Sequence, residues 1–344
     1  MSIETENVLP VRKIPLSSPA RPSLSGRRVL VTGGAGFIGS HLVDRLLDAR
    51  AAEVVVVDNL FLGNPVNLRQ ALERGAMLYR EDAEFVTSLE YIFDRHSVEV
   101  VFNCATKALN YSFANPSNAF STNVTVALNL LELQRKGRFK TLCHFSTSEV
   151  YGNATYEPMD ESHPKNPTTT YAAGKAAADL ALESYVGMFD LDAFIVRPFN
   201  NFGPRQNDSG PLAGVIPVTA RRIMEGGAPE IHGTGEQSRD FIYVHDTVDA
   251  VLKCYNVLPA GESVNISAEN CIAIGGLIEH IAKEMDFEGE IVRRPGRASD
   301  VACHNASSAK LKKLVDFRVT PFDEGLRRTL AWYRTNFDAR GENA

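Results

Sequence analysis

The chain has 344 residues, of which 44% are hydrophobic and 23% are charged, and its formal net charge is −6. This composition is typical of a globular protein with a buried core and excludes global disorder. The mild acidic excess argues against nucleic acid as a partner, so local basic groups must hold any anionic ligand. The length exceeds what one core usually covers, which predicts a large domain with a smaller one attached.

The five cysteines are scattered and lack the spacing of a zinc site, so we expect reduced thiols, a cytoplasmic protein and no bound metal. No apolar run approaches the roughly 20 residues of a membrane helix, and no membrane association is expected. The first residues combine acidic side chains, prolines and serines without the apolar segment of a secretory signal. Residues 1–26 are predicted to form a flexible arm, with an ordered strap on a neighbouring subunit as the alternative.

Between residues 27 and 198, short β-branched runs alternate with segments of helical pattern. The runs read RRVLVTG, EVVVVD, MLYR, VEVVFNCA, TLCHFS and DAFIVRP. Apolar strands that alternate with helices predict a doubly wound parallel sheet with helices on both faces. We therefore expect a Rossmann-type α/β domain over residues 27–198.

Glycine and proline become frequent after Pro198, and the strand-like runs become short and isolated. Helical patterns continue at 213–226, 245–257, 273–285 and 322–336. Residues 199–338 are predicted to form a smaller α/β lobe, mostly for substrate binding, followed by a tail at 339–344. Ligands of open parallel sheets bind at the carboxyl ends of the strands, so the cleft between the two parts is the expected site.

The segment VTGGAGFIG places Gly33, Gly36 and Gly39 between the first strand and the first helix. Gly33 permits the tight turn, Gly36 lets the backbone approach a pyrophosphate at the helix N-terminus, and Gly39 lets helix and sheet pack closely. The pattern predicts a dinucleotide cofactor. Phe37 and Ile38, the first residues of the helix, are expected beside it.

Asp58 stands at the end of EVVVVD, where a carboxylate can accept hydrogen bonds from the adenosine ribose hydroxyls. Its charge would repel a 2′-phosphate, which favours NAD over NADP. Asn59 follows it in the same loop, and Asp82, after the third strand, is expected near the adenine, with an ordinary loop carboxylate as the alternative. Pro198, at the end of the sixth strand, is a further expected cofactor contact.

Tyr171 and Lys175 in YAAGK are four positions apart and share one face of a helix. A lysine there lowers the pKa of the phenol and can bind the nicotinamide ribose, which makes Tyr171 a proton acceptor near neutral pH. Thr147, at the end of the fifth strand, can complete the hydrogen bonding to a substrate alcohol. These three residues are the expected catalytic set.

These motifs resemble the extended short-chain dehydrogenase/reductase family, in its NAD-dependent nucleotide-sugar epimerase/dehydratase branch. The resemblance runs from Arg27 to Tyr333 and includes TGGAGFIG, VDN, TN before LNLLE, STSEVYG, YAAGK, RPFNNFGP and RDFIYVHD. It implies a nucleoside-diphosphate sugar substrate whose C4 loses a hydride to NAD⁺ while the tyrosine takes the O4 proton. The product of this step is a 4-keto sugar.

The resemblance also assigns residues outside the catalytic set. Asn123 resembles the asparagine that steadies the active-site helix beside the cofactor, with a buried helix amide as the alternative. Asn200 resembles the asparagine that binds the nucleotide diphosphate, and Arg239 and Arg297 resemble arginines that clamp phosphate and ribose. Lys107 lies near a cofactor-contacting lysine of some epimerases, but its surroundings are one residue out of step.

The fate of the ketone depends on Ser148 and Glu149, which directly follow Thr147. Thr-Ser-Glu resembles the arrangement in 4,6-dehydratases of the GDP-mannose type and in uronic acid decarboxylases, whereas galactose epimerases usually carry small or neutral residues there. Glu149 could remove the C5 proton while Ser148, through water, assists loss of the C6 hydroxyl. A glutamate that only shapes the loop is the alternative.

We therefore expect a nucleotide-sugar 4,6-dehydratase, with a UDP-glucose 4-epimerase-type enzyme as the main alternative. UDP-glucuronate decarboxylases usually add an arginine in an RKPDI-like stretch, which the corresponding CHNASSAKLKKL lacks. A non-catalytic NAD-binding scaffold is disfavoured by the complete catalytic set. A simple alcohol dehydrogenase is disfavoured by the arginines of the smaller lobe.

Two helical segments, at 117–136 and 168–188, are candidates for subunit contact. The second is rich in alanine, and small side chains let a helix pack closely on two sides. The resemblance implies a homodimer built from these helices as a four-helix bundle. A good helix former that faces solvent on one side is the alternative.

Overall fold

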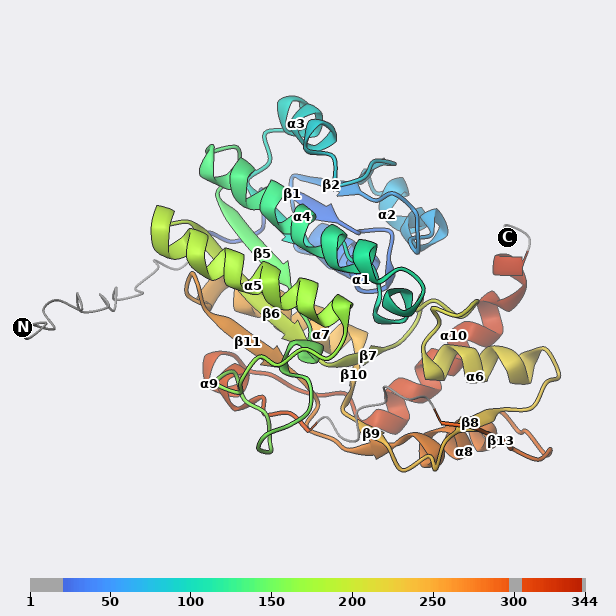
Figure 1. The fold of residues 1–344 in the computed structure, drawn as a ribbon. Helices are drawn as coiled ribbons and strands as arrows, with labels where there is room; N and C mark the ends of the chain where they lie inside the picture. Colours follow the sequence, from blue (N-terminus) through green and yellow to red (C-terminus); the bar gives the residue numbers. More distant parts are fainter. Residues whose placement is uncertain (1–20, 297–304, 342–344) are drawn as a thin grey trace, which may run out of the picture.

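The computed structural model describes residues 21–296 and 305–341, and its centre is a seven-stranded parallel sheet (Figure 1). The strands lie in the order β11-β6-β5-β4-β1-β2-β3. They are β1 (Arg28–Thr32), β2 (Glu53–Val57), β3 (Met77–Tyr79), β4 (Val100–Asn103), β5 (Thr141–Phe145), β6 (Asp192–Pro198) and β11 (Ser263–Ile266). The order reverses beside β1, which pairs with β2 on one side and with β4 on the other. The predicted Rossmann-type sheet is confirmed.

Helices cover both faces of the sheet because successive strand residues point to opposite sides. In β1, Val29 and Val31 belong to one core and Leu30 belongs to the other. The first core is closed by α1 (Phe37–Asp48), α2 (Arg69–Glu73), α7 (Val244–Val257) and α9 (Ala309–Leu314). The second is closed by α3 (Val86–Arg95), α4 (Pro116–Arg135) and α5 (Thr170–Phe189). Helices α4 and α5 lie side by side in front of the sheet in Figure 1.

Short 3₁₀ helices lie in loops that follow the carboxyl ends of three strands. They are η1 (Pro65–Leu68) after β2, η2 (Leu109–Phe113) after β4 and η3 (Ser148–Tyr151) after β5. Together with the turn after β1, these loops form the edge of the sheet where the sequence predicts the ligand site.

A smaller lobe lies beyond this edge and is built from short strand pairs and helices (Figure 1). The pairs are β7 (Asn200–Phe202) with β10 (Phe241–Tyr243), β8 (Glu230–His232) with β13 (Val292–Arg294), and β9 (Ser238–Arg239) with β12 (Ile272–Ala273). The helices are α6 (Val215–Met224), α8 (Ile274–Glu284) and α10 (Phe322–Gly341). Their apolar faces and the aromatic rings of β7 and β10 form a core of their own.

The predicted division at residue 198 is too simple, because the chain returns to the sheet after the lobe has begun. Strand β11 pairs with β6 at the edge of the sheet, and α7 packs against α1 on one face. The sequence pattern places both elements in the substrate lobe, but they belong to the layers of the large domain. At the other end, α10 continues to Gly341, past the start of the predicted tail.

The described part of the chain includes residues 21–26, which lie before the predicted boundary at residue 27. The Arg21 side chain is buried and donates from Nε to both carboxylate oxygens of Asp192, at 2.9 and 3.0 Å. Its Nη1 donates to the carbonyl oxygen of Tyr255 near the end of α7, at 2.8 Å. Residues 21–26 are thus fixed against the amino end of β6. The rest of the predicted arm lies outside the described residues.

No helix in the part of the chain that the structure describes combines the length and the apolar character needed to cross a membrane. No group of three or more His, Cys, Asp or Glu side chains among the same residues could hold a metal ion.

Candidate active site

Two neighbouring cavities lie between the carboxyl edge of the sheet and the smaller lobe. The first has a volume of about 450 Å³ and is bordered by the turn after β1 and by loops after β2, β4 and β5. The second has a volume of about 510 Å³ and is bordered by β7, β8, β9 and α6. Both volumes are typical of small-molecule sites. The residues that border both cavities are Asn110, Asn201, Gln206 and Gly214.

The glycine turn after β1 forms one wall of the first cavity. Gly33 has a φ of +66°, and a Cβ there would lie 2.7 Å from the amide nitrogen of Ala105. A Cβ on Gly39 would lie 2.3 Å from the carbonyl oxygen of Gly33. Gly36 is the N-cap of α1 and provides no side-chain cap, so the first N–H groups of the helix are available to an anion.

Asp58 borders the same cavity just beyond β2. Its carboxylate is almost fully buried and accepts the backbone N–H of Ala35 at 2.9 Å and of Leu60 at 2.8 Å. Burial raises the pKa of Asp58, and these N–H groups oppose the rise. Each carboxylate oxygen has a second lone pair, so the group can still accept a ribose hydroxyl. Nearby, Asn59 donates to the Asp82 carboxylate at 2.7 Å.

Most residues predicted for the cofactor and for catalysis come together at the first cavity. They are Gly33, Gly36, Phe37, Ile38, Gly39, Asp58, Asn59, Asp82, Thr147, Tyr171, Lys175 and Pro198. An uncapped helix N-terminus and a carboxylate with free acceptor capacity fit a dinucleotide whose adenosine ribose carries no phosphate.

Helix α5 supplies the tyrosine and the lysine of the catalytic set. Its N-cap Thr169 accepts the backbone N–H of Ala172 at 3.2 Å, which fixes the start of the helix at Thr170. Tyr171, the next residue, borders the first cavity. Lys175 is 2% exposed, and its Nζ donates to the carbonyl oxygen of Phe145 at 2.9 Å. Burial lowers the pKa of Lys175 to about 8, so nearby charges decide whether it stays protonated.

The Tyr171 hydroxyl is hydrogen-bonded to Thr147 after β5 and to Thr106 after β4. Burial nevertheless raises the pKa of Tyr171 to about 12, and the Glu149 carboxylate acts in the same direction. The expected lowering of this pKa by the lysine is not found in the protein alone. The reason is that desolvation of the phenolate outweighs the hydrogen bonds, while the lysine Nζ is directed to a backbone carbonyl.

Asn123 borders neither cavity, in contrast to its expected contact with the cofactor. Its side chain is 2% exposed, and its Oδ1 accepts from Thr106 Oγ1 at 2.9 Å and from the Lys107 N–H at 3.1 Å. Asn123 therefore fixes, from α4, the loop whose Thr106 hydroxyl reaches Tyr171.

Ser148 and Glu149 form the start of η3, where Thr147 Oγ1 accepts the Glu149 N–H at 3.2 Å. Ser148 is 3% exposed and borders neither cavity, in contrast to its expected approach to the substrate. It is buried because Val150 and Tyr151 anchor this short helix in a satellite core. Glu149 does not border the cavities either, but its carboxylate is close enough to raise the pKa of Tyr171.

Asn200 and Arg239, which the sequence predicts to bind the substrate, both border the second cavity. Asn200 Nδ2 donates to the carbonyl oxygen of Asp240 at 3.2 Å, and Arg239 Nη1 donates to the carbonyl oxygen of Ser238 at 2.8 Å. Arg297, the third predicted substrate residue, lies outside the described residues.

Sequence reasoning did not assign several residues of the first cavity. Thr106 could have been found, because it follows β4 and the carboxyl ends of parallel strands meet at one edge. Arg205 and Gln206 belong to FGPRQ, and Arg205 Nη1 lies 2.7 Å from Asp44 Oδ2 on α1. No local signal in that loop predicts its return to the glycine-turn helix. Lys107, left open above, borders the cavity with its Nζ 3.7 Å from the centre of the Phe61 ring.

Comparison with known proteins identifies the class of enzyme. The model of the NAD dependent epimerase/dehydratase family matches residues 29–267, and the chain belongs to this family. The chain is 32% identical to the putative UDP-glucose 4-epimerase of Methanocaldococcus jannaschii, a match that covers 90% of this chain and 99% of the relative. It is 30% identical to the UDP-N-acetyl-alpha-D-glucosaminuronate decarboxylase of Bacillus cytotoxicus, over 90% of this chain and 98% of the relative.

A solved structure extends the likeness to a third reaction. The double mutant of the dTDP-glucose 4,6-dehydratase of Streptomyces venezuelae, with NAD bound, has a TM-score of 0.85 and 28% identity. The match covers 91% of this chain and 98% of that one. The chain is thus an NAD-dependent enzyme of the nucleotide-sugar epimerase/dehydratase class, with epimerases, dehydratases and decarboxylases at similar identity.

Proposed function

We propose that this enzyme oxidises C4 of a nucleoside-diphosphate hexose and then eliminates water across C5 and C6, as a nucleotide-sugar 4,6-dehydratase. One observation supports the proposed C4 oxidation: Thr147, Tyr171 and Lys175 border a cavity that shares lining residues with a second cavity. The second cavity bears Asn200 and Arg239. A hexose placed between them reaches Tyr171 while its diphosphate extends towards Arg239.

The two cavities divide the binding work in this proposal. Gly36 and the N-terminus of α1 hold the pyrophosphate of NAD, and Asp58 holds the adenosine ribose. When bound, NAD accepts a hydride from the sugar and later returns it. The planar guanidinium of Arg239 binds the substrate diphosphate, and the Asn200 amide adds a donor.

Tyr171 takes the O4 proton, and Thr147, which is hydrogen-bonded to the phenol, orients the reacting hydroxyl. Lys175 supplies a positive charge one helical turn away, which favours the phenolate when the site is assembled. Loss of the C4 hydride and the O4 proton gives a ketone at C4. The ketone acidifies the neighbouring C5 proton.

Glu149 is the residue that we assign to the elimination. Its carboxylate acts on the Tyr171 phenol, which places it close to the catalytic set. As a base it takes the C5 proton, and the same proton then passes from the carboxyl group to O6 as the hydroxyl leaves as water. When the hydride returns to C6, C5 takes up a proton from solvent, and Tyr171 gives the O4 proton back to solvent. This assignment leaves Ser148 with the role of shaping η3, because its side chain is buried.

A 4-epimerase is the second candidate, and two observations favour it. The putative UDP-glucose 4-epimerase of Methanocaldococcus jannaschii is 32% identical over almost its whole length. Neither Ser148 nor Glu149 borders either of the two cavities described above. An epimerase needs only the Thr147, Tyr171 and Lys175 set, together with room for the 4-keto sugar to turn before the hydride returns.

Incubation with UDP-, GDP-, dTDP- and CDP-hexoses, followed by mass analysis of the products, separates these reactions. Loss of one water from one of the sugars is the expected result. Unchanged mass with inversion at C4 would establish the epimerase instead, and loss of CO₂ from a nucleotide uronic acid would establish a decarboxylase.

Replacement of Glu149 tests the elimination step by itself. Glu149→Gln removes the base and is expected to lower the rate of water loss by about 10² to 10⁴-fold while C4 oxidation continues. Glu149→Asp keeps a carboxylate and should retain part of the activity. Stopped-flow formation of NADH and mass analysis of the product measure the two steps, and full dehydration by Glu149→Gln would overturn the assignment.

We also propose that α4 and α5 form the interface of a homodimer. Their outer faces carry exposed large apolar side chains, and such a patch on two adjacent helices is typical of a contact between proteins. The exposed residues are Phe120 and Leu128 on α4 and Leu180, Met188 and Phe189 on α5. This interface coincides with the two helices that the sequence predicts for subunit contact.

A further inference from the structure

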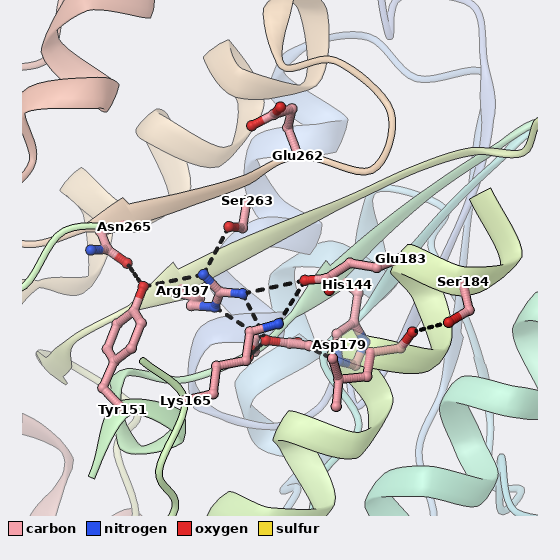
Figure 2. A network of polar contacts seen from close by, with 12 residues as sticks. His144, Tyr151, Lys165, Asp179, Glu183, Ser184, Arg197, Glu262, Ser263 and Asn265 are labelled. Atoms are coloured by element: carbon pink, nitrogen blue, oxygen red, sulfur yellow. Dashed lines mark hydrogen bonds and ion pairs between the residues drawn. The ribbon is translucent and has the colours of Figure 1, made fainter. Parts of the chain in front are cut away.

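A buried ion pair between Asp179 and Arg197 joins α5 to β6 (Figure 2). Asp179 is 0% exposed and Arg197 is 1% exposed. The Asp179 Oδ2 accepts from Arg197 Nε at 3.1 Å and from Arg197 Nη2 at 3.0 Å. The expected mechanism uses neither residue, although burying two charges in this way is costly unless further bonds satisfy them.

The pair is bonded to the chain segments that carry the catalytic residues. Asp179 Oδ2 also accepts from Ser146 Oγ at 2.9 Å, and Ser146 directly precedes Thr147. Arg197 directly precedes Pro198, which borders the first cavity. The carboxylate therefore fixes the turn after β5 against the end of β6.

On one side, the network continues into the sheet through His144. Thr32 Oγ1 donates to Asn103 Oδ1 at 2.7 Å, which leaves the Asn103 amide to donate to His144 Nδ1 at 3.1 Å. Burial lowers the pKa of His144 well below its usual value, so the ring is neutral and carries its proton on Nε2. That atom lies 4.0 Å from Asp179 Oδ1, and neither atom has a hydrogen-bond partner among the described residues.

On the other side, the network reaches η3, which carries Glu149. Arg197 Nη1 donates to the Tyr151 hydroxyl at 3.1 Å and to Ser263 Oγ at 2.8 Å (Figure 2). Tyr151 in turn donates to Asn265 Oδ1 on β11 at 2.7 Å. The phenol stays neutral, since burial raises the pKa of Tyr151 to about 12. Arg197 thus links the last residue of η3 to Asp179.

Asp179 also stands in a column with the catalytic residues of α5. Tyr171, Lys175 and Asp179 are spaced by four, so they share one face of the helix. The Asp179 charge raises the pKa of Lys175 against the effect of burial. Several charged and titratable side chains surround Lys175 and Asp179. They are Tyr171 and Glu183 on α5, Cys104 after β4, His144 on β5, Lys165 before α5, and Arg197 on β6.

We propose that Asp179 is a positioning residue for the reaction: its buried carboxylate keeps the Lys175 side chain in its charged form and holds the Ser146–Thr147 turn beside Tyr171. The inference rests on the proposed use of Lys175 in catalysis. Hydrogen bonds from Arg197 and Ser146 hold the carboxylate in place. Burial raises the pKa of Asp179, and the Arg197 charge opposes this rise and favours the ionised form.

A direct titration of Lys175 tests this role without any substrate. The Cε resonance of Lys175, in the full chain labelled at lysine and assigned by its loss in Lys175→Met, reports the charge on Nζ. Asp179→Asn is expected to lower the pKa of Lys175 by roughly one pH unit, because the negative charge that raises this pKa is gone. Should this single variant fail to fold beside an unpaired Arg197, the double variant Asp179→Asn/Arg197→Met removes both buried charges and is expected to show the same fall.

Tyr151→Phe is the matched control, because it removes a hydroxyl from the same network and leaves the Asp179 charge in place. Its Lys175 titration should equal that of the parent, and an equal fall in the control would mark a general loosening of the fold and overturn the specific role of Asp179. The alkaline limb of the pH dependence of NAD⁺ reduction should move with the Lys175 titration in each variant. An unchanged Lys175 titration in the double variant overturns the inference, whereas absence of turnover in the parent overturns only the proposed function.

Discussion

Three buried ionisable side chains near the cavities have pKa values displaced towards their neutral forms. Burial raises the pKa of Tyr171 to about 12 and that of Asp240 to about 7, and it lowers the pKa of Lys175 to about 8. In each case loss of hydration is the largest influence, and hydrogen bonds or nearby charges only reduce it. Desolvation by burial is therefore the main influence on the protonation states of these side chains, and individual neighbours such as Asp179 modify it.

The raised pKa of Asp240 makes the stability of the fold depend on pH. The residue is fully buried, accepts the Ala268 N–H at 2.9 Å, and its Oδ2 has no hydrogen-bond partner among the described residues. Its folded pKa of about 7 lies above its ordinary value of 3.8, so the folded state binds the proton more tightly than the unfolded state. The stability that this provides is complete below pH 3.8 and is lost as the pH rises through about 7.

We therefore predict that the free energy of unfolding of the parent falls relative to that of Asp240→Asn as the pH rises. Between about pH 5 and about pH 8 the relative loss should be roughly 2 to 3 kcal/mol. Urea unfolding of both proteins at the two pH values measures it. A difference that is the same at both values would mean that Asp240 does not titrate in this range.

Helix α5 shows how a single element meets two packing demands. Its inner side approaches α4 so closely that a Cβ on Gly174 would lie 2.8 Å from the carbonyl oxygen of Phe120. Further along the same helix, a Cβ on Gly187 would meet nothing within 4 Å. Small residues on α5 thus let it pack closely against α4 within one chain, in addition to their proposed role in the subunit contact.

The two glycines form a matched pair of substitutions. Gly174→Ala should lower the free energy of unfolding by about 1 to 3 kcal/mol, because the added methyl group forces α4 and α5 apart. Gly187→Ala should raise it by about 0.5 to 1 kcal/mol, since alanine favours the helix and has room. Chemical denaturation measures both, and equal effects of the two changes would contradict the close approach of the helices.

The proposed dimer makes a prediction for the outer face of the same helices. Leu180 is 55% exposed and Met188 is 71% exposed, so charges at these positions are tolerated by the monomer. Leu180→Glu/Met188→Glu should convert a dimer into monomers with little loss of monomer stability, as measured by sedimentation equilibrium. Leu72→Glu, at a 38% exposed residue of α2 on the opposite face of the sheet, should leave the dimer intact. A parent that sediments as a monomer would refute the proposal.

At the scale of the whole molecule, the sequence predicted the parallel sheet because the strands before Pro198 are short apolar runs that alternate with helical patterns. It did not predict that β11 and α7 rejoin the sheet. The run SVNIS is short and carries no signal of its partner, and only its pairing with β6 in space assigns it to the large domain.

The site was predictable to the extent that its residues belong to local motifs. The glycine turn, Asp58 and the Tyr171–Lys175 pair come from contiguous segments, and all of them border the first cavity. The burial of Ser148 depends on how Val150 and Tyr151 of η3 pack into a small core. The Asp179–Arg197 pair depends on contact between α5 and β6. Such contacts between distant segments leave no spacing that can be read from one chain.

The central claim is that C4 is oxidised and that the hydride returns to C6 of the same sugar after water has left. A nucleotide hexose deuterated at C4 tests this most directly, with the product examined by mass analysis and by NMR. We predict a product that has lost one water, carries a ketone at C4 and holds the deuterium on its C6 methyl group. A product of unchanged mass, with inverted configuration and the deuterium still at C4, would contradict the account.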